Sequence, residues 1–155
     1  MIRQILMIII ALACTLGAGA QTAKELYQQG KALYDAKDYA KAFPILQKAA
    51  QKGNKKAQYR LGRCYAKGRG VAKDKNEAFR WYSKSADQDY GKAQYQVGKC
   101  YLKGKGVQAD EKKARKWLNK AVKNPKHGAE ILKSIRDEAA LGDEDAKAIL
   151  QLLNL

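Results

Sequence analysis

The chain has 155 residues, which suits one domain or one short repeat array with a core of moderate size. Its 31 lysines and arginines outnumber 15 acidic residues, so the formal net charge is +16. Such a surface attracts anions, whether an acidic protein, a polyanionic glycan or lipid, or nucleic acid. An alternative interpretation is that the surplus lysine only keeps a lysine-rich helical protein soluble.

Residues 1–20 are predicted to be a secretory signal peptide that is removed before Gln21. Arg3 supplies a positive start, residues 5–16 are almost wholly apolar, and Ala18-Gly19-Ala20 offers small residues to signal peptidase. The apolar run is short for a membrane span, and no other long apolar stretch follows it. We therefore expect an exported protein, either periplasmic or secreted.

A lipid anchor at Cys14 is the alternative for this segment. Ala11-Leu12-Ala13-Cys14 faintly resembles a lipoprotein cleavage site with Cys14 as the lipidated residue. Such sites usually have leucine at the place of Ala11 and a small residue at the place of Leu12. Membrane contact is expected only if this alternative holds.

Residues 22–53 are predicted to form a first helix pair with a short turn. Gly30 and Leu33-Tyr34 fall in its first helix, and Asp38 caps the second. The second helix carries apolar residues at helical spacing, and Pro44 inside it should produce a kink. The residues expected to face inward from this helix are Tyr39, Ala42, Phe43, Leu46, Ala49 and Ala50.

Residues 56–91 and 92–127 repeat each other with a shift of 36 positions. The two segments share 15 identities in 36 positions without a gap. Each segment is predicted to be a helix, a loop and a helix, with the helices of the first unit at about 55–66 and 75–89. Gly68-Arg69-Gly70 ends the first helix, and Val71 packs the loop down. Asp74 caps the second helix, and Glu77 is predicted to complete a capping box.

The second unit repeats this pattern with small changes. Asp110 repeats the cap, but Lys113 replaces the glutamate, and Asn124-Pro125 closes the second helix. Gly62 and Gly98 lie inside helices, where glycine costs about 1 kcal/mol relative to alanine. A repeated cost predicts a repeated close approach between the first helix and its partner.

These residues carry a family resemblance. Units 56–91 and 92–127 resemble Sel1-like repeats, relatives of the tetratricopeptide repeat, and residues 22–53 resemble a tetratricopeptide-like pair that lacks the Gly-x-Gly-Val loop. The resemblance implies an all-α, right-handed α/α superhelical solenoid that acts as a scaffold for protein–protein interaction. The residues of the first unit that match are Ala57, Leu61, Gly62, Tyr65, Gly68, Gly70, Val71, Asp74, Ala78, Trp81 and Lys84.

Residues 128–155 are predicted to form a degenerate pair that caps the solenoid. Ile131, Leu132 and Ile135 mark one helix, and Asp143 can cap the last helix. That last helix is marked by Ala146, Ile149, Leu150 and Leu153. Residues 21–155 are therefore expected to form one solenoid of about eight helices in four antiparallel pairs, in a monomer.

We found no catalytic set in the sequence, and we expect no enzyme activity, cofactor or metal. The single histidine, His127, is expected to be a solvated loop residue, and no glycine-rich phosphate loop is present. Cys64 and Cys100 occupy equivalent places in successive helices, about 8–10 Å apart between axes, which is too far for a disulfide. We expect two buried free thiols.

A basic stripe is predicted on the solvent side of the first helices. On a helical wheel its members in the first unit lie within about 60° of one another, opposite Ala57 and Leu61. First helices line the concave face in tetratricopeptide-like solenoids, so the resemblance places the stripe in a groove suited to an acidic peptide or a carboxylate. The stripe consists of Lys56, Arg60, Arg63, Lys67, Lys92, Gln96, Lys99 and Lys103.

Three functions compete. The first is an exported scaffold that binds a protein or peptide of acidic character through this groove. The second is a charge-driven binder of polyanions or the envelope surface, and the third is a hydrolase or β-lactam-binding protein, as suggested for some cysteine-rich relatives. Nucleic acid is not an expected partner of an exported chain. The surface for the second function would be the basic loops, with Lys67, Arg69, Lys73, Lys75, Lys103 and Lys105.

Overall fold

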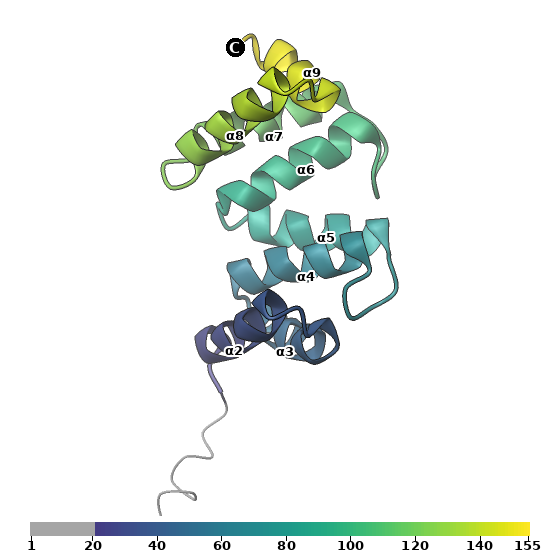
Figure 1. Ribbon diagram of the computed structural model, residues 1–155, viewed down its shortest axis with the longest axis vertical. Helices are drawn as coiled ribbons and strands as arrows, with labels where there is room; N and C mark the ends of the chain where they lie inside the picture. Colours follow the sequence, from purple (N-terminus) through teal and green to yellow (C-terminus); the bar gives the residue numbers. More distant parts are fainter. Residues whose placement is uncertain (1–20) are drawn as a thin grey trace, which may run out of the picture.

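The computed structural model describes residues 21–155, and the predicted signal peptide and Cys14 lie outside this range. The described residues form eight α-helices and no strand. They stack from one end of the molecule to the other in chain order (Figure 1). The helices are α2 (Ala23–Asp35), α3 (Tyr39–Gln51), α4 (Lys55–Lys67), α5 (Lys75–Ala86), α6 (Gly91–Lys103), α7 (Glu111–Val122), α8 (Gly128–Ala140) and α9 (Glu144–Leu153).

The helices form a solenoid of antiparallel pairs, which confirms the predicted fold class. Within the first three pairs, α2 packs on α3, α4 on α5 and α6 on α7. Between pairs, α3 packs on α4 and α5 packs on α6, whereas α7 contacts both α8 and α9. The second helix of each of the first three pairs therefore lies between two first helices, and the apolar core runs along the stack.

Most of the apolar residues at helical spacing are in this core. Leu46, Leu61 and Leu118 are fully buried, α5 buries Ala78, Trp81, Tyr82, Ser85 and Ala86, and Tyr39 and Phe43 are partly buried. α3 continues through Pro44 as one helix. In the last pair Ile131, Ile135 and Ile149 are buried. No described helix has the length and apolar content needed to cross a membrane.

Side-chain caps start most helices, as the sequence predicted, with one correction. The Asp74 carboxylate accepts from the backbone N–H groups of Asn76 and Glu77, and Asp143 caps α9 in the same way. The predicted capping box at Glu77 is wrong. Its carboxylate instead accepts from Trp81 Nε1 at 3.1 Å and from Arg80 at 3.0 Å, because these donors lie one helical turn further along. The reciprocal box is found at Thr22 and Glu25 in α2.

The helical glycines mark a repeated close approach, and both a side chain and the backbone of the partner helix make it. A Cβ at Gly62 would lie 3.2 Å from the Ala78 carbonyl oxygen, and one at Gly98 would lie 3.1 Å from the Leu118 backbone nitrogen. A Cβ at Gly62 would lie 2.6 Å from the Tyr82 ring, and one at Gly98 would lie 2.6 Å from Leu118 Cγ. Gly30 stands in the same relation to Leu46 in the first pair. Each glycine therefore makes room for one large buried side chain of the partner helix.

The loops between paired helices rest on the previous repeat. Gly106 has φ +72°, and a Cβ there would lie 2.0 Å from the Lys75 carbonyl oxygen at the start of α5. Gly70 lies equally close to the Tyr39 carbonyl at the start of α3. Only glycine tolerates both this dihedral angle and this approach. The loop therefore fixes one repeat against the one before it.

We predict that Gly98→Ala lowers the free energy of unfolding by about 1 kcal/mol. The added methyl group gains about 1 kcal/mol of helix propensity but overpacks Leu118, which costs about 1–3 kcal/mol. Urea denaturation of Gly98→Ala, Leu118→Ala and the double variant measures this coupling. In the Leu118→Ala background the same glycine substitution should become neutral or stabilising, and stabilisation in the wild-type background would contradict the packing argument.

Candidate functional site

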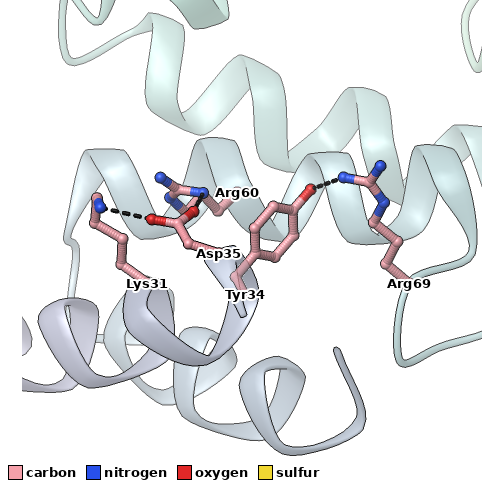
Figure 2. A network of polar contacts seen from close by, with 5 residues as sticks. All are labelled: Lys31, Tyr34, Asp35, Arg60 and Arg69. Carbon is pink, nitrogen blue, oxygen red and sulfur yellow. Dashed lines mark hydrogen bonds and ion pairs between the residues drawn. The ribbon is translucent and has the colours of Figure 1, made fainter. Parts of the chain in front are cut away.

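The predicted basic stripe lies on α4 and α6, but the structure supplies it with acidic partners from neighbouring repeats. Arg60 pairs with Asp35 of α2 at 3.1 Å, and Lys31 pairs with the same carboxylate at 2.6 Å (Figure 2). The hydrogen bond from Lys31 and the charge of Arg60 lower the pKa of Asp35. The Arg60 guanidinium also lies 5.0 Å from the Tyr34 ring centroid. Through these contacts Arg60 of α4 helps to hold α2 against α4.

The loop residue Arg69 is likewise used inside the protein. Its guanidinium donates to the Tyr34 hydroxyl at 2.5 Å, as Figure 2 shows, and lies 4.9 Å from the Tyr39 ring centroid. The hydrogen bond to Tyr34 raises the pKa of Arg69. Arg63 lies 5.7 Å from the same Tyr34 ring. Several basic side chains of the first repeat therefore contact aromatic rings inside the protein.

In the second repeat two lysines of the stripe meet acidic residues of the last helix pair. Lys92 pairs with Glu130 at 2.8 Å, and Lys103 pairs with Asp145. Each lysine lowers the pKa of its carboxylate, chiefly through the hydrogen bond. These pairs join different units, so the charge pattern within one unit does not reveal them.

Four members of the stripe, Lys67, Gln96, Lys99 and Lys103, line one cavity, here called the lysine pocket. Lys56 does not reach it and instead lies 5.9 Å from the Tyr27 ring centroid. The pocket has a volume of about 400 Å³ and lies between the C-terminal ends of α4 and α6, beside α5. Ala66, Ala78, Tyr82 and Cys100 give it an apolar part. Some stripe residues and most of the basic loop residues line it, so the two predicted surfaces meet at this cavity. Its polar lining consists of Lys67, Lys73, Lys75, Gln96, Lys99, Lys103 and Lys105.

This pocket is strongly cationic. Within residues 21–155, Lys103 alone among its six lysines makes an ion pair with a carboxylate. Lys67 and Lys103 lie in the last turns of α4 and α6, where the helix dipole favours positive charge. The arrangement can attract and hold an anionic group.

A smaller cavity, here called the tyrosine pocket, lies beside it. It has a volume of about 190 Å³ and is lined by Tyr59, Lys92, Tyr95, Gln96, Glu130, Ile131 and Ser134. Burial raises the pKa of both tyrosine hydroxyls, so both rings are uncharged over the physiological range. Gln96 lines both pockets, and they therefore adjoin.

The two cysteines are free and buried, as predicted. Burial raises the pKa of the Cys64 and Cys100 thiols to about 11. Few thiolates form near neutral pH at such values, which argues against a nucleophilic role. Among the described residues, no group of three or more histidine, cysteine, aspartate or glutamate side chains could hold a metal ion.

The prediction that His127 is solvated is wrong. Its residue is 8% exposed, and its ring packs edge-on against Tyr90 with centroids 4.8 Å apart. Its Nδ1 lies 3.3 Å from the Asn124 side-chain oxygen, which also accepts from the His127 backbone N–H at 3.1 Å. The Asn124 side chain closes the turn and places the His127 ring between α6 and α8, and the local sequence pattern does not predict this contact.

Comparisons with known proteins identify the family. The Sel1 repeat family matches residues 16–54, 55–90 and 91–125. The chain belongs to the Sel1 repeat family. The match includes the first helix pair, although that pair lacks the Gly-x-Gly-Val loop. Sel1 repeats generally mediate protein–protein interaction, and proteins built from them are typically non-catalytic scaffolds.

Solved structures with the same fold include other Sel1 repeat proteins. A Sel1 repeat protein from Oxalobacter formigenes is 27% identical with a TM-score of 0.65, covering 84% of this chain and 56% of its own. A protective antigen of uropathogenic Escherichia coli displaying an SLR fold is 29% identical with a TM-score of 0.64, covering 84% of this chain and 28% of its own. This chain thus spans about half and about a quarter of their lengths.

A third similar structure is cysteine rich protein B of Helicobacter pylori. It is 25% identical with a TM-score of 0.52, and the match covers 86% of this chain and 100% of that one. Among curated proteins no match was found.

We predict that Arg60→Glu destabilises the fold by about 1–2 kcal/mol, because it replaces an ion pair and an aromatic contact with two adjacent carboxylates. Lys67→Glu, at an exposed position with no ion pair among residues 21–155, should change stability by less than about 0.5 kcal/mol. Thermal unfolding of the two variants measures the difference. Equal stability would show that the Arg60 contacts contribute nothing.

We also predict that stability falls as the pH drops below about 6.5, the usual histidine pKa. Burial and the nearby Lys92 lower the pKa of His127, so the unfolded chain takes up a proton that the folded chain resists. The stability is complete above pH 6.5 and declines below it, before the carboxylates titrate. Chemical denaturation between pH 5 and 8 should show this decline in the wild type but not in His127→Gln.

Proposed function

We propose that this protein is an exported, non-catalytic scaffold that binds an acidic segment of a partner protein in the lysine pocket. The observation that carries the proposal is that six lysines line one cavity. Among the described residues, only one of the six, Lys103, pairs with a carboxylate. The family supports a protein partner, and the charge supports an acidic one.

The binding surface is narrower than the predicted stripe. Arg60 and Lys92 are paired with Asp35 and Glu130, and they position helices as well as contributing charge. Four other members, Lys67, Gln96, Lys99 and Lys103, line the lysine pocket together with Lys73, Lys75 and Lys105, whereas Lys56 and Arg63 do not line it. A carboxylate-rich segment entering here would exchange the hydration of its charges for several lysine contacts at once.

Charge reversal at Lys67 and Lys105 tests the proposal. Both residues are exposed pocket lysines, so their replacement by glutamate should leave the fold intact while placing negative charge at the site. We expect a glutamate-rich peptide to bind the wild type at least about tenfold more tightly than Lys67→Glu/Lys105→Glu, measured by fluorescence anisotropy.

The matched control is Lys24→Glu/Lys48→Glu. It changes the net charge equally, at two exposed lysines of the first helix pair that do not line the pocket. This control should retain wild-type peptide affinity at 0.15 M salt, where charges further apart than about 8 Å are largely screened. Equal loss in both variants, or equal binding of both to anionic phospholipid vesicles without peptide binding, would indicate charge-driven surface attachment instead.

A further inference from the structure

We propose that the tyrosine pocket takes one aromatic side chain of the same partner segment, a few residues from its acidic part. This inference rests on the proposed function, since it treats the two adjoining pockets as one site. The partner segment would then combine a cluster of carboxylates with one aromatic residue at a set distance.

The size and lining of the tyrosine pocket fit a single side chain. Its volume of about 190 Å³ is below the roughly 300–1,000 Å³ typical of small-molecule sites. Tyr59 and Tyr95 are equivalent residues of successive repeats, and Ile131 of α8 adds an aliphatic surface. Aromatic rings pack favourably against such walls in edge-on or offset arrangements.

The walls are held in place before any ligand binds. The Tyr59 ring packs against Tyr82 and Tyr90, with centroids 5.8 and 5.3 Å apart. The Lys99 ammonium lies 5.2 Å from the Tyr95 ring centroid. A preorganised pocket loses little side-chain entropy on binding, so contacts with it contribute more to affinity.

The charges of the two pockets differ in a way that would orient the segment. Lys92 and Glu130 form an ion pair at the tyrosine pocket, so their charges offset each other there. The lysine pocket carries a large positive excess. A carboxylate is therefore drawn to the lysine pocket, while a neutral ring can enter the tyrosine pocket without leaving a charge unpaired.

The helix geometry sets the spacing. Lys99 and Lys103 follow Tyr95 on α6 by four and eight residues, which corresponds to about 6 and 12 Å along the axis. An extended peptide advances about 3.3 Å per residue. The aromatic residue should therefore lie about two to four residues from the carboxylates.

Paired peptides test this inference. One peptide has three glutamates, a one-residue glycine spacer and a phenylalanine, and its partner has alanine in place of the phenylalanine, each made in both chain directions. In at least one direction, we expect the phenylalanine peptide to bind the wild type about tenfold more tightly, as partial burial of one aromatic side chain predicts.

Two variants locate the effect. Tyr95→Ala removes a wall, and Ser134→Trp fills the pocket from an exposed position on α8. Both should abolish the preference for phenylalanine while the alanine peptide binds as it does to the wild type. Because Tyr95 also contacts Lys99, Ser134→Trp is the cleaner of the two.

The outcomes separate the two proposals. Equal wild-type affinity for the two peptides, with both still sensitive to Lys67→Glu/Lys105→Glu, would overturn the aromatic subsite but keep acidic recognition. A phenylalanine preference that survives Ser134→Trp would overturn its location. Binding of neither peptide would overturn the proposed function and this inference with it.

Discussion

The solenoid depends on the contact between a helical glycine and one large side chain of the paired helix. Gly30, Gly62 and Gly98 face Leu46, Tyr82 and Leu118 respectively, each too closely for a Cβ. This approach lets the second helix of each of the first three pairs lie between two first helices, where it buries the core. α5 packs on both α4 and α6, so its position sets the spacing of these two helices. The lysine pocket between α4 and α6 depends on that spacing.

Contacts between repeats decide which basic residues remain available for a partner. Arg60, Arg69 and Lys92 reach across to α2, to the tyrosines of the first pair and to α8. Where the neighbouring repeat offers no carboxylate, the lysines stay unneutralised and gather at the loop ends of α4 and α6. The proposed binding site is thus the part of the basic surface that makes few contacts between repeats.

Equivalent positions of the repeats also serve different purposes. Tyr59 and Tyr95 follow the same pattern in sequence and each lies under a cation, Arg63 and Lys99 respectively. Tyr59 also packs on Tyr82 and Tyr90. The partner of Gly62 is Tyr82, but that of Gly98 is Leu118. A repeat pattern therefore predicts the backbone better than it predicts the surface.

The sequence by itself determined the helices, their caps and the buried faces, because these depend on residues three or four positions apart. It also determined that Cys64 and Cys100 are buried free thiols. Only the tertiary structure decided why His127 is buried and which lysines pair with carboxylates of other repeats. These features join residues 30 or more positions apart, as Lys92 and Glu130 are, and no local pattern predicts such a pair. Glu77 has several possible partners within one helical turn, and the local pattern does not decide among them.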